Sequence, residues 1–331
     1  MIGYYDAGAQ QELPVEALQP EGLTHVVLVN ALKVDSSGAL HLRAAADASE
    51  RSAEELLGAL AGLAARPQGG PRLVVSVRGE PDDVALDELA EVDEARQRFA
   101  GEVASRLRSW GAGGLEVEWH SDDPAGGKAT AAPFDLMEQY HFALLCRDLA
   151  GAFQGGAGNL TLSVATRPGR QEFADGAFVR KFVSWLALRA YSMRSLGDPH
   201  HSSLKDMAAA LDEWTARGVP KAQLVLGTPL FGRPGAALHS AGDRNEALRR
   251  PWRELARGGL RPQRGQAQNR DGRGDMFLDA ASGKVWWASG PNTTQAKARH
   301  VLRHGYGGLA LRDLHQDARE PRASLVQAAR E

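Results

Sequence analysis

Eight short apolar runs, separated mostly by amphipathic stretches, constrain the fold of this chain more than any other feature. The runs cover residues 1–5, 24–31, 72–77, 114–119, 159–165, 184–191, 222–229 and 306–312. Helical spacing of apolar residues is found in 48–65, 93–111, 134–153 and 203–218, and 319–331 is typical of a closing helix. Strands separated by helices pair in parallel, and near-continuous apolar strands are buried on both faces. The pattern predicts one α/β domain over residues 1–331, a (β/α)8 TIM barrel.

The connection between the seventh and eighth runs is the longest. Residues 234–295 are rich in Gly, Arg and Gln and contain the aromatic stretch KVWWA. We interpret this segment as a short insertion that carries a small hairpin or two, and not as a separate domain. The length of 331 residues agrees with a single domain, since α/β barrels exceed the usual domain size.

Charge and composition exclude several classes of function. The formal net charge of −2 argues against a protein that binds nucleic acid or a membrane surface, which usually needs a basic excess. No apolar run approaches the roughly 18 residues that span a bilayer. The single cysteine, Cys146, is expected to be a small buried hydrophobe. We see no signal peptide and expect a cytoplasmic protein or one exported by a non-classical route or within an assembly. The abundance of Ala, Arg and Gly is typical of a bacterial genome rich in G and C.

The stretch GGLEVEWH, residues 113–120, carries a row of ionisable side chains. Alternation along a strand places Glu116, Glu118 and His120 on one face. They end a barrel strand, where TIM barrels carry their chemistry. These are also metal-ligand types, but their spacing along a strand is too long for one ion to take all three. We therefore predict no metal and no cofactor here.

Seven motifs in order resemble those of glycoside hydrolase family 18, the chitinases and their relatives. The motifs are IGYYDAG, LTHVVLVNALKVDSSGAL, LVVSVRG, RFAGEVASRLRSWGAGGLEVEWH, LALRAYS, GVPKAQLVLGTPLFGRP and YGGLALRDLHQD. Together they extend over nearly the whole chain. The resemblance implies the TIM barrel and a site for N-acetylglucosamine polymers.

The fourth motif departs from the family pattern at its most important position. In the family its last acidic residue protonates the leaving oxygen, and the preceding Asp positions the N-acetyl group of the substrate, which acts as nucleophile. The shared Trp119 sets the register, so that His120 occupies the acid position and Glu118 the positioning one. Glu118 is not a substitute acid, because it lies about 6.6–6.8 Å back along the strand and proton transfer needs heavy atoms about 3 Å apart.

Other family positions have changed as well. Ser192 and Arg189 replace the Asp and Met of the sixth-strand motif Met-x-Tyr-Asp, and Arg78 replaces a glycine of the third. Arg312 stands at the tryptophan that forms the floor of the sugar site. Because buried carboxylates need partners and guanidinium groups supply them, we predict that these three arginines form a salt-bridged plug with Glu116, Glu118 and His120.

These departures predict a catalytically inactive chitinase-like protein, acting as a structural, assembly or binding module. Two alternatives stay open, a weak or altered glycoside hydrolase on N-acetylglucosamine polymers and a lectin that binds chitooligosaccharides. The expected partners are a protein or assembly and a chitin-type oligosaccharide, with no nucleic acid and no membrane. The candidate binding residues are Tyr191, Trp119, Arg189, Arg312, Arg78 and Arg233.

Two further pairs of residues, one of tryptophans and one of histidines, are candidates for binding sites. Trp286 and Trp287 suggest a surface platform for carbohydrate, but we favour core packing of one and exposure of the other. His200 and His201, in DPHHSS, are expected in a solvated loop and not at a zinc site.

Overall fold

A computed structural model gives the structure of the protein. It describes residues 1–35, 38–45, 50–66, 69–78, 85–119, 136–155, 159–169, 173, 175–191, 200–234, 249–257, 261–262, 275–279 and 285–331. The predicted residues His120 and Ser192 lie outside these ranges. In the part of the chain that is described, no helix combines the length and the apolar character needed to cross a membrane.

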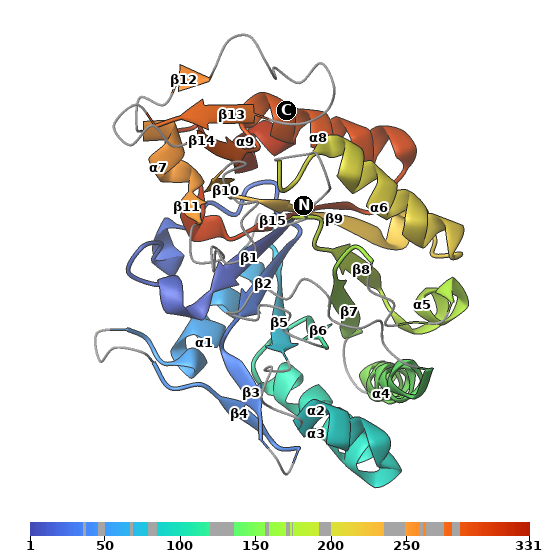
Figure 1. The fold of residues 1–331 in the computed structure, drawn as a ribbon. Helices are drawn as coiled ribbons and strands as arrows, with labels where there is room; N and C mark the ends of the chain where they lie inside the picture. The colour runs from blue at the N-terminus through green and yellow to red at the C-terminus, as the bar shows by residue number, and fades with distance from the viewer. Residues whose placement is uncertain are drawn as a thin grey trace.

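Eight parallel strands close into a barrel, as the sequence predicts (Figure 1). Going round it, the order is β1, β15, β9, β8, β7, β6, β5 and β2. Each predicted apolar run overlaps one of these strands. Their bounds are β1 Ile2–Asp6, β2 His25–Val29, β5 Arg72–Arg78, β6 Gly114–Glu118, β7 Thr161–Thr166, β8 Trp185–Leu188, β9 Leu224–Pro229 and β15 Gly308–Arg312.

Helices surround this barrel. They are α1 Ala53–Ala64, α2 Ala85–Glu91, α3 Asp93–Ser109, α4 Leu136–Gln154, α5 Gly176–Phe182, α6 Leu204–Ala216, α7 Trp252–Arg257, α8 Pro291–His304 and α9 Leu325–Arg330. Short 3-10 turns lie at Ala7–Ala9, Val15–Ala17, Lys221–Gln223 and Leu314–Gln316. Helix α1 begins with a capping box between Ser52 and Glu55, and α8 ends at Gly305, whose φ of 73° favours glycine. The start of α8 falls inside the predicted insertion.

Two smaller sheets stand beside the barrel. Strands β3 Leu32–Val34 and β4 Leu40–Leu42 form an antiparallel pair after the second barrel strand. A second, five-stranded sheet, which we call the insertion sheet, has the order β11, β10, β14, β13, β12. Four of its strands lie in the predicted insertion, and most of β10 precedes it. The strands of this sheet are β10 Phe231–Pro234, β11 Arg250–Pro251, β12 Arg261–Pro262, β13 Asp275–Leu278 and β14 Val285–Ala288.

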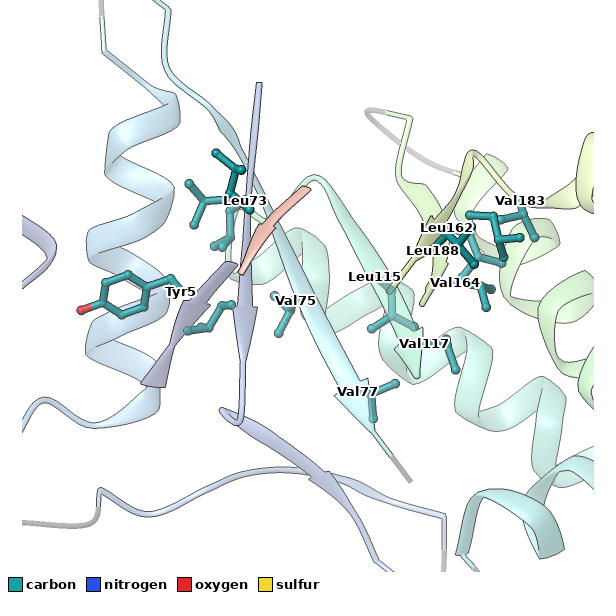
Figure 2. Packing of buried hydrophobic residues seen from close by; sticks show 14 of the residues in the cluster. Tyr5, Leu73, Val75, Val77, Leu115, Val117, Leu162, Val164, Val183 and Leu188 are labelled. Carbon is teal, nitrogen blue, oxygen red and sulfur yellow. The ribbon is translucent and has the colours of Figure 1, made fainter. Parts of the chain in front are cut away.

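Strand alternation produces two apolar cores. The outer core lies between strands and helices and includes Val75, Leu115 and Val117 (Figure 2). Cys146 of α4 belongs to the same core, as expected. The inner core fills the barrel with Ile2, Tyr4, Val27, Val29, Val74, Ala165, Trp185, Ala187, Val225 and Ala310. Side chains with the parity of the inner core continue upward to the carboxyl ends of the strands, where the candidate site lies.

Candidate functional site

The carboxyl end of the barrel carries polar and charged side chains above the inner apolar core. Glu116 and Glu118 alternate on β6 with the outer-core residues Leu115 and Val117, so both glutamates face inward, as predicted. Strand β6 pairs with β5 in a register that sets Ser76 beside Glu116 and Arg78 beside Glu118. The two glutamates therefore lie near side chains from β1 and β5, from the residue after β8, and from the end of β15.

Glu116 is held by hydroxyl groups. The Tyr4 hydroxyl donates to Glu116 Oε2 at 2.7 Å, and Ser76 Oγ donates to Oε1 at 3.4 Å. Burial raises the pKa of the Glu116 carboxyl, although the hydrogen bonds and the nearby charges of Arg312 and Arg189 lower it. The expectation of a guanidinium partner for Glu116 is thus corrected, because Tyr4 of β1 reaches this carboxyl from across the barrel interior.

Glu118 forms an ion pair with Arg189, which follows β8. Both residues are buried, with exposed fractions of 3% and 6%. Arg189 Nε also donates to the Tyr191 hydroxyl at 2.9 Å. Burial lowers the pKa of the Arg189 guanidinium, yet arginine stays protonated in proteins, so the pair is ionic. The ion pair between Glu118 and Arg189 is a contact of the kind that the predicted salt-bridged plug requires.

A glycine on the neighbouring strand makes room for this arrangement. A Cβ on Gly227 of β9 would lie 2.8 Å from the Leu188 carbonyl oxygen and 3.2 Å from a ring carbon of Tyr191. A side chain at Gly227 would therefore push the end of β8 away. Strand β8 ends there, and two backbone hydrogen bonds of short sequence separation follow it. The Ala190 amide donates to Leu188 O and the Tyr191 amide donates to Arg189 O, each at 2.8 Å.

Arg312 ends β15 and lies above the barrel interior. Its guanidinium carbon is 5.1 Å from the centre of the Tyr4 ring, and its Nε is 3.3 Å from Asp313 Oδ1. Guanidinium groups stack favourably on aromatic faces. Arg312 was predicted to lie near Glu116. Its charge acts on the glutamate and lowers the pKa of that carboxyl. Among the described residues, the ion-pair contact of Arg312 is with Asp313 and not with Glu116.

A small pocket opens between β2, β5, β6 and β15, and we call it the mouth pocket. Its polar lining consists of Asn30, Arg43, Ser76, Arg78, Glu118 and Arg312. The enclosed space accommodates about one water molecule. The described part of the mouth therefore has charged side chains where an open sugar cleft would need free volume.

The remaining predicted binding residues occupy different places. Trp119 packs in the outer core against Phe142, with ring centres 4.6 Å apart, and so faces away from the mouth. Tyr191 contacts Phe231 edge to face at 5.9 Å. Arg233, on β10 in the insertion sheet, lies over the same Phe231 ring at 5.9 Å. The structure thus links Tyr191 to Arg233 through Phe231 and separates Trp119 from them.

Both tryptophans of the insertion are buried. Trp286 and Trp287 have exposed fractions of 7% and 9%. The prediction that one of them is exposed is wrong, because both lie in β14, which pairs with β10 on one side and with β13 on the other. A surface platform for sugar is therefore not formed by this pair.

The predicted solvated loop at His200 and His201 is also buried. His200 Nε2 donates to the Ala288 carbonyl at 3.0 Å, while its Nδ1 accepts from the Ser202 amide at 3.0 Å. This pattern requires a neutral ring, and burial lowers the pKa of His200 to about 3. His201 stacks on Phe231 with ring centres 5.4 Å apart. The correction arises because the insertion sheet covers this segment.

Sequence reasoning missed a buried lysine next to these histidines. Lys297 Nζ donates to Ser202 O at 2.9 Å, Ser202 Oγ at 3.1 Å and Ser289 Oγ at 2.6 Å. Burial lowers the pKa of Lys297 to about 7. A signal was present, since Lys297 shares the buried stripe of α8 with Thr293, Thr294 and Val301 at helical spacing. Over the described ranges, no three His, Cys, Asp or Glu side chains are grouped to hold a metal ion.

The chain is similar to known proteins along most of its length. Residues 1–317 match glycosyl hydrolases family 18. The chain belongs to this family. By sequence it is 24% identical over 181 residues to probable chitinase 10 of Drosophila melanogaster, covering 50% of this chain and 8% of that protein. It spans well under half the length of the relatives that it matches by sequence.

Solved structures of family 18 share the fold. A chitinase from Cycas revoluta, solved with allosamidin, matches with a TM-score of 0.78 at 19% identity, covering 99% of this chain and 98% of its own. Human YKL-39, a pseudo-chitinase with retained chitooligosaccharide binding properties, matches with a TM-score of 0.77 at 15% identity over the same shares. Both likenesses show the same barrel fold over nearly the whole of each chain.

Proposed function

We propose that this chain is a catalytically inactive member of family 18 that acts as a binding or assembly module. The observation that carries the proposal is the buried ion pair between Glu118 and Arg189. By its resemblance, Glu118 occupies the place of the acidic residue that positions the N-acetyl group of the substrate. A carboxylate fixed to a guanidinium would first have to lose that partner, in a site with little room, before it could take this role.

Two sequence positions support the same proposal. His120 stands where the family has its proton donor, and a histidine beside carboxylates holds its proton in an ion pair instead of acting as a neutral acid. Arg312 stands where the family has the floor tryptophan, and its guanidinium lies over Tyr4. Proton donation, positioning of the N-acetyl group and sugar stacking would all be lost together.

Hydrolysis of a fluorogenic chitobioside tests the proposal. We expect no turnover above the buffer rate for the wild-type chain and for His120→Glu, because the single substitution leaves Arg189 on Glu118 and Arg312 at the floor position. An active family 18 chitinase with an intact motif serves as the positive control. Turnover by the wild type that His120→Ala abolishes would support an altered hydrolase instead, and activity gained by His120→Glu would refute the role assigned to the arginines.

Binding of chitooligosaccharide without cleavage is the second candidate function. Its specific support is YKL-39, which has this fold and retains such binding as a pseudo-chitinase. Calorimetry with the tetramer of N-acetylglucosamine separates the two candidates. Saturable heat would favour a lectin, whereas no heat at millimolar sugar, together with a protein captured from the native host, would favour the assembly role.

A further inference from the structure

The mouth pocket contains a buried cationic donor without a complete set of partners. Arg312 is 7% exposed, and its Nη1 has no hydrogen-bond partner among the described residues. The Nε atom of the same guanidinium lies 3.3 Å from Asp313 Oδ1, and the group stacks on Tyr4. A buried N–H of a charged group that makes no hydrogen bond costs free energy, so this atom favours an acceptor from outside the chain.

The charges around the pocket favour an anionic acceptor. Three guanidinium groups from separate segments, those of Arg43, Arg78 and Arg312, line it together with one carboxylate, that of Glu118. Glu118 is already matched by Arg189, which lies behind it. Glu116, below, accepts hydrogen bonds from the hydroxyls of Tyr4 and Ser76, and burial raises the pKa of its carboxyl. The lining therefore carries more arginines than carboxylates, which favours an anionic ligand over a cationic one.

Geometry and size narrow the class of anion. Guanidinium groups bind carboxylates through short, charge-assisted hydrogen bonds. The enclosed space suits one water-sized atom group, such as a single carboxylate oxygen, and excludes a whole sugar ring. The side-chain amide of Asn30 and the hydroxyl of Ser76 add polar groups to the same lining.

We propose that the mouth pocket binds the carboxylate group of a small acidic ligand, with Arg312 Nη1 as a donor to it. This inference deepens the proposed function, because it gives the class of ligand that the same mouth takes once it no longer serves as a chitin cleft. The rest of the ligand extends outward from the pocket, since only the carboxylate enters it.

Calorimetry on the full chain, at low ionic strength in a zwitterionic buffer, tests the inference. Sodium acetate probes the carboxylate alone, sodium glucuronate an acidic sugar, N-acetylglucosamine a neutral sugar and sodium chloride a spherical anion. We expect saturable heat with acetate and glucuronate and none with N-acetylglucosamine. Tighter binding of glucuronate than of acetate would identify an acidic saccharide, and equal binding would identify a simple carboxylate. Binding of chloride as tight as that of acetate would overturn the assignment to carboxylates.

Substitutions of Arg312 test whether the heat of binding comes from this residue. Arg312→Gln is expected to weaken binding of glucuronate by about tenfold or more, since a hydrogen bond to a charged group is lost. Arg312→Lys keeps the charge and supports folding, and we expect it to weaken binding as well because it lacks the fork of donors. Arg303→Gln, at an exposed arginine of α8, is the matched control and should leave the affinity unchanged.

The outcomes are separable from those of the hydrolysis test. No heat with either carboxylate, or an equal loss in Arg303→Gln, refutes the anion site and leaves the proposed inactivity untouched. Turnover of the chitobioside refutes the proposed inactivity while the calorimetric result still stands. If Arg312→Gln fails to fold by circular dichroism, Arg312→Lys alone decides, because unchanged affinity in that folded variant would refute the role of the guanidinium.

Discussion

Replacing Arg189 with methionine is expected to lower the free energy of unfolding by about 3–5 kcal/mol, the usual cost of leaving one member of a buried ion pair alone. The substitution would leave the Glu118 carboxylate, which is 3% exposed, without its guanidinium partner. It would also remove the donor to the Tyr191 hydroxyl. Urea unfolding followed by circular dichroism measures the loss as a lower midpoint at unchanged slope.

A double-mutant cycle with Glu118→Leu distinguishes the ion pair from simple packing. The double variant should recover much of the lost stability, because an apolar pair of similar volume avoids the desolvation of both charges. The matched control is Arg106→Met on α3, where the pair with Glu102 is partly exposed and is expected to contribute less than about 1 kcal/mol. A loss in Arg189→Met no larger than in Arg106→Met would show that Glu118 is hydrated or protonated in the folded protein.

The prediction has a functional consequence as well as an energetic one. If the pair is as strong as expected, Glu118 cannot be released to a substrate without a comparable cost, and sugar binding seldom provides that much from a single contact. A small loss of unfolding free energy in Arg189→Met would, by the same reasoning, argue against the proposal that the protein is inactive. The stability experiment therefore tests the physical basis of the functional proposal independently of any assay of hydrolysis.

The barrel was predictable because its signals are local. Each strand is a short apolar run, and the inward direction of Glu116 and Glu118 follows from alternation along one strand. Even the meeting of Arg189 with Glu118 followed from the rule that the ends of parallel strands share one face of the barrel. These inferences needed only residues close in sequence and one rule of topology.

The errors concern contacts between segments far apart in sequence. Glu116 obtains its closest partner from Tyr4, 112 positions earlier, because β1 lies across the barrel interior from β6. His200 is buried, and its ring forms a hydrogen bond with the carbonyl of Ala288, which lies 88 positions later in the insertion sheet. The polar residues around that histidine favoured a solvated loop, and nothing in the local pattern indicated that a second sheet covers it.

Lys297 makes the stability of the protein depend on pH in a window where few other groups titrate. Its side chain is fully buried, and the hydrogen bonds from its amine go to oxygens of Ser202 and Ser289. Burial lowers its pKa from 10.5 to about 7, against the opposing charge of Asp275. Between these two values the unfolded chain holds a proton that the folded chain has released. Stability therefore rises with pH across this window.

The expected magnitude is large. The slope is about 1.4 kcal/mol per pH unit for one proton, so that the cost of burying the charged amine, about 5 kcal/mol, is fully present below pH 7 and is relieved as the pH approaches 10.5. His200 has a lowered pKa of about 3, and the pKa of His201 is also lowered, so their effect is confined to more acidic solutions, below 6.5. The lysine and histidine contributions are thus separated by pH.

Comparison with Lys297→Met isolates this contribution from every other titrating group. The difference in unfolding free energy, wild type minus variant, should rise between pH 7 and pH 10, because methionine fills the same space without a proton to lose. Lys205→Met, at an exposed lysine of α6, should give a difference that stays flat over the same range. A flat difference for Lys297→Met would mean that the amine keeps its charge in the folded protein, stabilised by Asp275 and the three oxygen acceptors more strongly than burial opposes it.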